Sequence, residues 1–466
     1  MNMTQKNSIV HPYIPNSAAV NKEKIMRELG IKDIDELYAD IPERLRFRGE
    51  MNIPPAMASE QELRKHIMGI MDKNSTCEEY VSFLGAGCAN HYVPAICDEI
   101  TGRAEFLTAY AGEPYEDHGR FQVLFEFESL MAELLDVEVV SVPTFDWGQA
   151  ASNSIRMAGR VAKKDEMIVA GNISPDRLKV IKNYCEPVMK ISPVKHDVET
   201  GMIDLKDLKE KISPDTAGIY YENPVYLGFL EQQGDTIADL IHRENGVVVV
   251  GTDPISLGVI APPSHYGADI ICGDIQGLGN HMYFGGSLGG FIGTRDEEKY
   301  VMEYPWRLFG IARTEVEGEW GFGDVAYDRT SFGVREKGKE FVGTAAALYG
   351  VSATVYLSLL GPHGIRELGQ CILQNSLYAQ KRIAGIPGVS LRFKGANFKE
   401  FTVDFSGTGK SVESINKALL ENGIFGGKDI SAEFDELGDC ALFCVTEVHS
   451  KADIDTLILN LNKILK

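Results

Sequence analysis

Two apolar stretches that lie close together in the chain, VVVVGTD at residues 247–253 and ADIICGD at residues 268–274, indicate the fold. Both are short and almost wholly apolar before a closing aspartate, which is typical of parallel strands that are buried on both faces. In open α/β sheets, ligands bind beyond the carboxyl ends of such strands. The sequence therefore places an acid, Asp253, where a ligand would be expected. No lysine occurs between Lys211 and Lys299.

The surrounding sequence continues this pattern. Apolar runs of strand length alternate with helical stretches between about residues 76 and 330, and Gly, Pro or Asp punctuates the runs. Besides the two already quoted, these runs are MIVAG at residues 167–171, GIYYENP at 218–224 and GGFIGT at 289–294. The alternation predicts an α/β domain in which helices cover a mainly parallel sheet.

Different patterns flank this central region. Residues 1–75 combine short helical patterns with proline breaks, and Ser59 precedes a 3.6-residue apolar repeat, as an N-cap would. This segment has too few apolar residues to fold alone, so we expect a helical arm that lies on the main body or on a partner. Residues 331–466 contain two long helical patterns followed by VSLRF, EFTVDFS and CALFCVTEV. This order predicts a small C-terminal α+β domain.

Composition excludes several classes of function. The chain has 466 residues, with 46 Lys and Arg against 67 Asp and Glu, giving a net charge of −21. Nucleic-acid binding depends on clustered basic residues, so this balance argues against a nucleic-acid partner. The sequence shows neither a signal-peptide core nor a membrane-length apolar run, so we expect a cytoplasmic protein that does not bind membranes.

The eight cysteines are interpreted as buried free thiols rather than metal ligands. They are scattered without a CxxC pair, and several stand inside apolar runs. Zinc sites usually need close pairs, and a reducing cytosol disfavours disulfides. No metal site is predicted.

Four longer motifs connect the chain to a known family. These are IDELYADIPERLRFRGEMNIPPAMASEQELRKH, SFLGAGCANHYVPAICDEITGRAEFLTAY, FGGSLGGFIGTR and YLSLLGPHGIREL. Together they resemble the glycine cleavage system P-protein, and specifically its separately encoded N-terminal half, subunit 1 or alpha. The resemblance runs from about residue 11 to the C-terminus. It implies the architecture of the pyridoxal-phosphate-dependent transferases of fold type I.

The resemblance also implies a reaction and a set of partners. In the family, homologous alpha and beta subunits form a heterotetramer, and the beta subunit carries the lysine that holds pyridoxal phosphate as a Schiff base. The enzyme is an oxidoreductase that decarboxylates glycine and passes an aminomethyl group to the lipoyl group of a carrier protein. By resemblance, this chain is the alpha-like subunit that lacks the lysine, and its partner holds most of the cofactor.

Four residues are candidate contacts for the cofactor. Asp253 stands where the fold pairs an aspartate with the cofactor's ring nitrogen, although a helix cap or a relic that holds the turn would also explain it. His281 lies near the expected lysine loop, where it either reaches a neighbouring subunit's site or is purely structural. Gly285 and Gly286 allow close backbone approach, but a tight turn would also explain them.

The expected phosphate-binding segment, residues 143–158, departs from the family pattern. The family usually reads close to YDGATALAEA here, whereas this chain has Trp147 at the glycine and Gln149 at the threonine. A bulky indole and a lost hydroxyl argue against phosphate binding at this helix N-terminus.

Two loops depart further from the family. Residues 111–122 read AGEPYEDHGRFQ in place of a stretch close to TPYQPEISQGTLQ, and they contribute Tyr115, His118 and Arg120. These side chains suit carboxylate recognition and proton transfer, although a solvated loop would look similar. Residues 335–348 keep Lys337 but lose the hydroxyl and amide groups of the family's SNICTN.

These departures leave three functions open. Glycine decarboxylation is the leading one, and a related complex that acts on another amino acid or amine is the second. The third is a scaffold or regulatory protein without catalysis. Altered loops on a preserved frame fit a changed substrate, but drift in a non-catalytic subunit predicts the same changes.

Overall fold

The computed structural model describes residues 10, 13–14, 17–49, 51–57, 59–107, 118–306, 308–325, 329–331, 333, 336, 338–340 and 346–466. The chain divides into two units, Met1–Asn74 and Ser75–Lys466, each of which is described by itself.

The first unit consists of helices that bury none of their side chains. Its elements are α1 (Ala19–Leu29), the 3-10 helices η2 (Ile34–Tyr38) and η3 (Glu43–Leu45), and α2 (Glu60–Met71). Ser59 caps α2 by accepting a hydrogen bond from the backbone N–H of Glu62, as its position before the apolar repeat predicts. No described residue of this unit is buried, and α2 leaves Leu63 and Ile67 almost half exposed.

A seven-stranded sheet forms the centre of the second unit, in the order β2-β8-β7-β6-β5-β3-β4. The strands from β7 to β4 pair in parallel, whereas β8 runs antiparallel to both β7 and β2. Their bounds are β2 (Val139–Val140), β3 (Glu166–Ala170), β4 (Lys190–Val194), β5 (Thr216–Glu222), β6 (Val247–Thr252), β7 (Ile270–Asp274) and β8 (Gly290–Thr294). The prediction of a mainly parallel sheet is confirmed.

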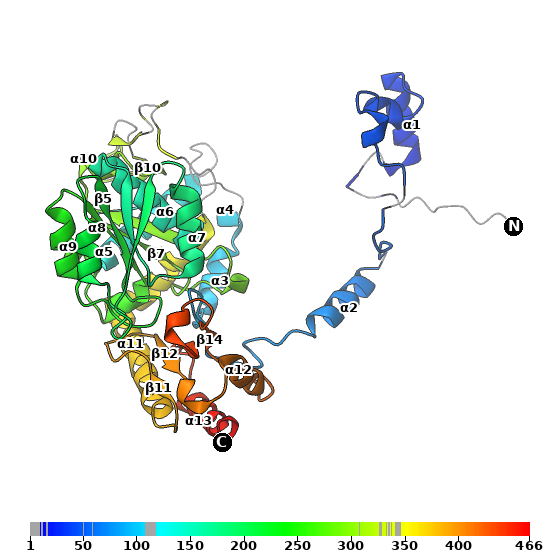
Figure 1. The fold of residues 1–466 in the computed structure, drawn as a ribbon. Coiled ribbons are helices and arrows are strands. Elements are labelled where there is room, and N and C mark those ends of the chain that lie inside the picture. Colours follow the sequence, from blue (N-terminus) through cyan, green and yellow to red (C-terminus); the bar gives the residue numbers. More distant parts are fainter. Residues whose placement is uncertain are drawn as a thin grey trace. The chain divides into compact units, whose positions relative to one another are not determined.

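Burial explains why these stretches lack the alternation of a half-exposed strand. Every residue of β5, β6 and β8 is buried, so both faces of each strand need side chains that avoid water. Helices supply the cover, and Figure 1 shows α9 on one side of the strands and α7 on the other. The covering helices are α5 (His118–Leu135), α6 (Trp147–Ala162), α7 (Pro175–Cys185), α8 (Leu205–Lys211) and α9 (Gly234–His242).

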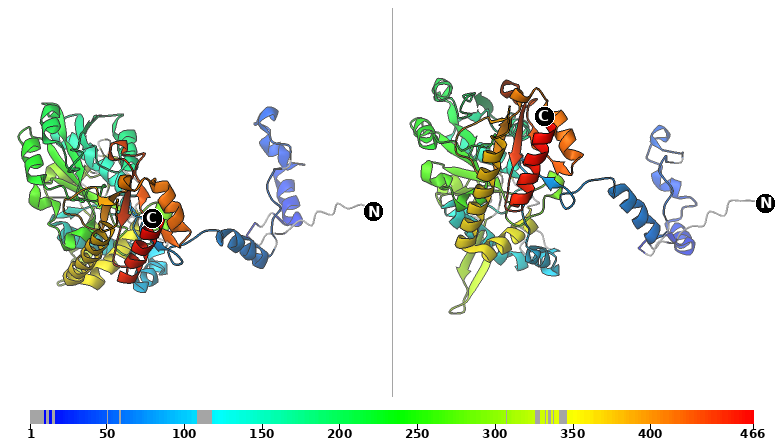
Figure 2. Two further views of the ribbon diagram at one scale, coloured as in Figure 1. Left: turned by 60° about the horizontal axis from the view of Figure 1, so that its bottom comes forward. Right: turned by 90° about the horizontal axis from the view of Figure 1, so that it is seen from below.

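The C-terminal region begins with a long helical element, α11 (Ala347–Ile383). The sequence indicated two helices here, and the backbone leaves helical geometry at Gly361, just before Pro362. Proline cannot continue a helical hydrogen-bond ladder, and this explains the break. Figure 2 shows α11 running beside the C-terminal helix α13 (Lys451–Ile464).

A second, antiparallel sheet packs with these helices, in the order β11-β12-β15-β14. Its strands are β11 (Ser390–Leu391), β12 (Glu400–Asp404), β14 (Lys428–Asp429) and β15 (Cys440–Cys444), and α12 (Val412–Leu420) accompanies them. We call Ala347–Lys466 the C-terminal subdomain. A strand from the beginning of the second unit also joins it, because β1 (Val81–Ser82) pairs in parallel with β13 (Ile424–Phe425).

The remaining described elements are one hairpin and several short helices. A hairpin of β9 (Phe309–Arg313) and β10 (Trp320–Asp324) extends from the body in the right-hand view of Figure 2. The short helices are α3 (Ala95–Thr101), α4 (Ala104–Leu107), α10 (Glu298–Val301), η4 (Pro254–Gly258), η5 (Pro263–Tyr266), η6 (Tyr283–Gly285), η9 (Ser406–Thr408) and η10 (Asp435–Leu437). Among the described helices, none has the length and hydropathy needed to cross a lipid bilayer. All eight cysteines are free thiols, and five of them are buried.

Candidate functional site

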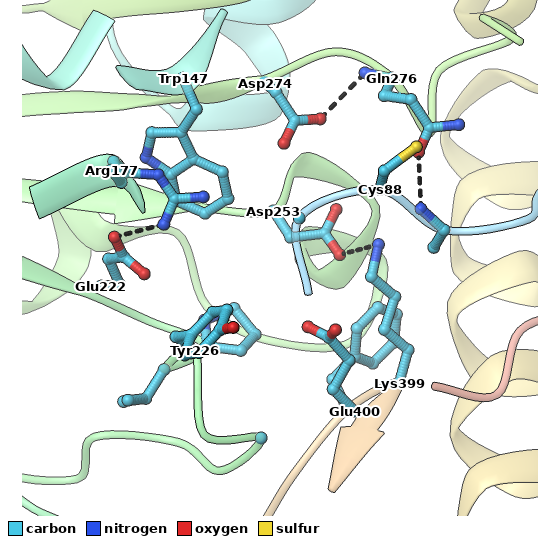
Figure 3. Close-up of a pocket in the computed structure, with 16 residues that line it drawn as sticks. Cys88, Trp147, Arg177, Glu222, Tyr226, Asp253, Asp274, Gln276, Lys399 and Glu400 are labelled. Carbon is cyan, nitrogen blue, oxygen red and sulfur yellow. Dashed lines mark hydrogen bonds and ion pairs between the residues drawn. The ribbon is translucent and has the colours of Figure 1, made fainter. Parts of the chain in front are cut away.

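A cleft opens at the carboxyl edge of the large sheet, where that sheet faces the C-terminal subdomain. Carboxylates stand at the ends of β5 and β7 and directly after β6, and two more charged residues, at the start of β12 and just before it, face them from the opposite side (Figure 3). The charged residues that line it are Arg177, Glu222, Asp253, Asp274, Lys399 and Glu400. Sequence reasoning placed Asp253 at this edge, and the structure brings the other five to the same space.

Parallel strands create the acidic wall of the cleft. Glu222 ends β5, Asp253 directly follows β6, and Asp274 ends β7. Since the carboxyl ends of adjacent parallel strands meet at one edge, their terminal carboxylates come together. The side chain of Asp253 also accepts a hydrogen bond from the backbone N–H of Ile255 and so caps η4. Asp253 is therefore both a turn cap and a wall of the cleft.

An aromatic and cationic stack fills one end. The guanidinium of Arg177 lies 3.9 Å from the centre of the Trp147 ring and forms an ion pair with Glu222. The Trp147 indole N–H donates to the hydroxyl of Tyr220 at 3.1 Å, and that hydroxyl donates in turn to Glu222 at 3.0 Å. Each polar group of this stack has a partner within the chain, so the stack is held in place without a ligand.

The opposite wall comes from the start of β12. The ammonium of Lys399 lies 2.8 Å from the carboxylate of Asp253, and only 15% and 14% of these side chains are exposed. Glu400 accepts a hydrogen bond from the backbone N–H of Ala86 at 2.6 Å. Burial alone would lower the pKa of Lys399, but the acidic groups around it, led by the Asp253 carboxylate, together raise that pKa above its usual range. Lys399 therefore stays charged inside the cleft.

A glycine explains how β12 comes so close to the large sheet. Gly228, in the loop after β5, has a φ of +80°, and a Cβ atom there would lie 2.6 Å from the backbone nitrogen of Phe401. Only a residue without a side chain permits this contact between two backbones. The contact places Lys399 and Glu400 over the ends of β5 and β6.

The cleft carries more acid than base. Four carboxylates face two cations, and Arg177 and Lys399 are already paired with Glu222 and Asp253. Burial, and then the charge of Asp253, raise the pKa of Asp274 to about 6. Burial also raises the pKa of Glu400 above its usual range. Asp274 and Glu400, the two carboxyl groups without a cationic partner, therefore hold a proton more tightly than exposed carboxyl groups do.

The residues of this chain do not fit a pyridoxal phosphate bound covalently within it. The segment of residues 275–281 that follows β7 has no lysine. At the N-terminus of α6, the Asp146 carboxylate already accepts the backbone N–H of Gln149 at 2.7 Å, and the Gln149 side chain accepts that of Phe145. An acidic cap there opposes an incoming phosphate. Lys399 occupies the cationic position beside Asp253.

The other candidate cofactor contacts lie outside this cleft. The His281 ring is about half exposed and contacts the Asp98 carboxylate at 2.9 Å. Gly285 is the last residue of η6 and Gly286 follows it, and both lie at the surface near the fully exposed Phe284. Gly285 has a φ of +81° and no other atom near its missing Cβ, so the turn itself accounts for it. None of the three lines the cleft.

The structure describes only some of the candidate residues in the two altered loops. Tyr115 and Lys337 lie outside the described residues, and of His118 only its position as the first residue of α5 is described. Arg120 is buried, and its guanidinium donates to the backbone carbonyl of Phe106. Arg120 does not line the cleft of this chain. Its role at a shared site stays a prediction.

Sequence reasoning missed Arg177, Glu222, Asp274, Lys399 and Glu400. Two of these had a detectable signal, because Glu222 and Asp274 close apolar strand runs in the same way as Asp253. The others reach the cleft only through tertiary contacts between segments that lie far apart in the sequence.

Comparison with known proteins identifies what this arrangement is similar to. Residues 11–461 match the model of the family described as glycine cleavage system P-protein. A relative from Staphylothermus marinus is 38% identical over 463 residues, covering 98% of both chains, and is named probable glycine dehydrogenase (decarboxylating) subunit 1. A relative of the same name from Pyrococcus abyssi is 38% identical, covering 97% of this chain and 99% of its own.

Solved structures agree with the sequence comparisons. A crystal structure of glycine decarboxylase (P-protein) of the glycine cleavage system, in inhibitor-bound form, superimposes with a TM-score of 0.84 at 27% identity. It covers 98% of this chain and 100% of its own. A glutamate decarboxylase from Lactobacillus brevis shares the fold at 11% identity, with a TM-score of 0.69.

Proposed function

The chain belongs to the glycine cleavage system P-protein family, and from this premise we propose that it is the subunit 1 (alpha-like) chain of a decarboxylating glycine dehydrogenase. Its substrate is glycine, and the acceptor is the lipoyl group of a carrier protein. The observation that carries the proposal is the near full-length similarity to relatives named as subunit 1.

The cleft supports a division of labour between two chains. Family membership calls for pyridoxal phosphate, which acts as an electron sink when an amino acid loses its carboxylate. The segment of residues 275–281 that follows β7 has no lysine, and Lys399 already pairs with Asp253. We therefore assign the cofactor and its lysine to a homologous beta-like subunit. This chain supplies the other half of the assembly, and two copies of each form a heterotetramer.

The exposed apolar surface of the first unit supports such a partner. Its large apolar side chains include Leu63, Ile67 and Ile70 on α2, each between 45% and 49% exposed. Apolar surface of this kind is stabilised when another surface covers it. We assign this cover to the beta-like subunit.

Reconstitution tests the proposal. This chain and its beta-like partner are purified separately and together, and carbon dioxide release from carboxyl-labelled glycine is measured with a lipoylated carrier. We expect activity only when both chains and the carrier are present. Alanine, serine and small amines serve as competing substrates. Turnover of one of these without turnover of glycine would favour the alternative of a related complex, and an inactive but stable complex would favour a scaffold.

A further inference from the structure

Four polar side chains form a continuous chain of contacts that begins in the cleft. Asp253 contacts the ammonium of Lys399 at 2.8 Å, and that ammonium lies 3.2 Å from Nε2 of His91. Nδ1 of His91 lies 2.9 Å from Glu447, whose other carboxylate oxygen accepts the backbone N–H of Tyr92 at 2.8 Å. The chain thus connects the end of β6 with the segments before β12 and after β15.

The chemistry of these groups fixes the position of each proton. A lysine ammonium is only a donor, so Nε2 of His91 must accept. Nδ1 then carries the hydrogen and donates it to Glu447, and His91 is neutral. Glu447 receives two hydrogen bonds, one from the His91 ring and one from the backbone N–H of Tyr92. Glu447 is therefore an ionised acceptor at the end of the chain.

Separation of the two walls would be costly. His91 has only 1% of its side chain exposed, and the two charges of the Lys399–Asp253 pair are mostly shielded from water. If β12 moved away from β6, one ammonium and one carboxylate would lose their partners in a poorly solvated space. Glu400, Asp274 and the Cys444 thiol also surround Lys399. None of these groups can carry a positive charge, so none could replace Lys399 as the partner of Asp253.

We propose that Lys399 is a built-in occupant of the cation subsite of this cleft, and that its bridge from Asp253 to His91 locks the C-terminal subdomain onto the large sheet. The ammonium stands where a bound ligand would present a positively charged nitrogen to Asp253. The position beside Asp253 therefore binds an alkylammonium group, and the side chain of Lys399 supplies that group. The resulting contacts hold the two walls of the cleft together. This inference concerns the chain alone and holds whatever substrate the assembled enzyme uses.

Chemical rescue tests the subsite. Lys399→Ala removes the three methylene groups and the ammonium that n-propylammonium would restore. We expect the full-length variant to unfold at least about 5 °C below the parent chain, because a buried pair loses one partner. Added n-propylammonium should raise the Tm of Lys399→Ala along a saturating curve. Tetramethylammonium, which has the charge but no N–H donor, should not.

The matched control removes a lysine of the same kind from the surface. Lys190 pairs with Glu166 at 2.8 Å, as Lys399 does with Asp253, but 71% of its side chain is exposed. We expect Lys190→Ala to keep its Tm and to show no saturable response to n-propylammonium. Equal responses of the two variants, or no response of Lys399→Ala, would overturn the proposal.

A double variant covers the case in which Lys399→Ala fails to fold. Lys399→Met and Asp253→Asn each leave one charge unpaired, whereas the double variant leaves none. We expect the double variant to unfold at a higher temperature than either single variant, because two neutral groups need no compensation. Losses of Tm that simply add would show that the two residues are independent and would refute the lock. Neither measurement requires the partner subunit or catalytic activity, so failure here is distinct from failure of the proposed function.

Discussion

Asp253 has a different role in this chain from the one that its position suggests. In the fold, an aspartate at this strand end faces a cationic ring nitrogen, whereas here it faces Lys399 from the C-terminal subdomain. The sequence identified Asp253 because strand and acid are adjacent in the chain. It could not reveal Lys399, whose approach depends on the contact of Gly228 with the backbone of β12. The residues next to Asp253 in the sequence were thus sufficient to locate the site, whereas the partner of Asp253 is determined by tertiary packing.

Asp274 should make stability depend on pH. Its pKa is about 6 in the folded chain against an ordinary value of 3.8, so the folded state holds the proton more tightly. The stabilisation is complete below about pH 4 and is lost as the pH rises through 6. Asp274→Asn cannot lose a proton, and its amide oxygen can still accept the Gln276 N–H.

We therefore expect Asp274→Asn to match the parent near pH 4 and to exceed it in unfolding free energy by about 3 kcal/mol at pH 7. Denaturant unfolding of both proteins between pH 4 and pH 7 measures this difference. A difference that stays constant over the whole range would exclude a raised pKa at Asp274.

The start of α5 tests whether the altered loop takes part in catalysis. We expect His118→Ala and Arg120→Ala each to lower kcat/KM of the assembled complex by about tenfold or more, as removal of a substrate-orienting group does. Because Arg120 is buried and holds the Phe106 carbonyl, Tm and complex assembly are measured alongside. Arg243→Ala, at the exposed C-terminal end of α9, is the control. If both test variants kept the kinetics of the parent complex, the loop would take no part in catalysis, and its altered residues would reflect sequence drift.

At the scale of elements, the loop after β5 sets the distance between the two sheets. Gly228→Ala would place a Cβ 2.6 Å from the Phe401 nitrogen, so a backbone segment would have to move. Gly409 has a similar φ of +70° but open space around it, so Gly409→Ala reports the backbone strain alone. We expect the Gly228 variant to lose about 2 kcal/mol more unfolding free energy than the Gly409 variant. Equal losses by chemical denaturation would show that the close approach is unimportant.

The arm helix α2 is the element that we expect to bind the partner. Ile67 stands on its exposed apolar face, and Lys65 points to another side of the same helix. Ile67→Asp should weaken association with the beta-like subunit at least tenfold, because a charge would enter an apolar contact. Lys65→Asp adds the same side chain and should leave association nearly unchanged. Sedimentation of the mixed subunits measures both, and equal affinities would remove α2 from the interface.

Elements were predicted more accurately than their arrangement. The runs that became β3, β5, β6 and β7 were recognisable because strands buried on both faces need continuous apolar sequence. The pairing of β1 with β13 was not, because a two-residue strand carries no periodicity and its partner lies more than 300 residues away. The β9–β10 hairpin was also missed, because its strands, FGIAR and WGFGD, are partly exposed and do not have the wholly apolar sequence of strands buried on both faces.

At the scale of the whole molecule, the chain belongs to the P-protein family, and we propose that it is one half of a shared enzyme. Similarity over nearly its full length places it in the P-protein family, and its own cleft already contains the cation that Asp253 needs. Sequence motifs spread along the chain were sufficient to identify the family. They could not show that Lys399 pairs with Asp253, because this contact joins residues from the two sheets. The domain boundary near residue 330 and the assembly with a partner stay predictions.

The most direct test of the central claim is to locate the lysine that holds pyridoxal phosphate in the assembled complex. The complex of this chain with its beta-like partner is reduced with borohydride and digested, and the pyridoxyl-lysine peptide is identified by mass spectrometry. The account predicts stoichiometric labelling of one lysine of the partner and no labelled peptide from this chain, Lys399 included. Stoichiometric label on Lys399, or on any other lysine of this chain, would contradict it.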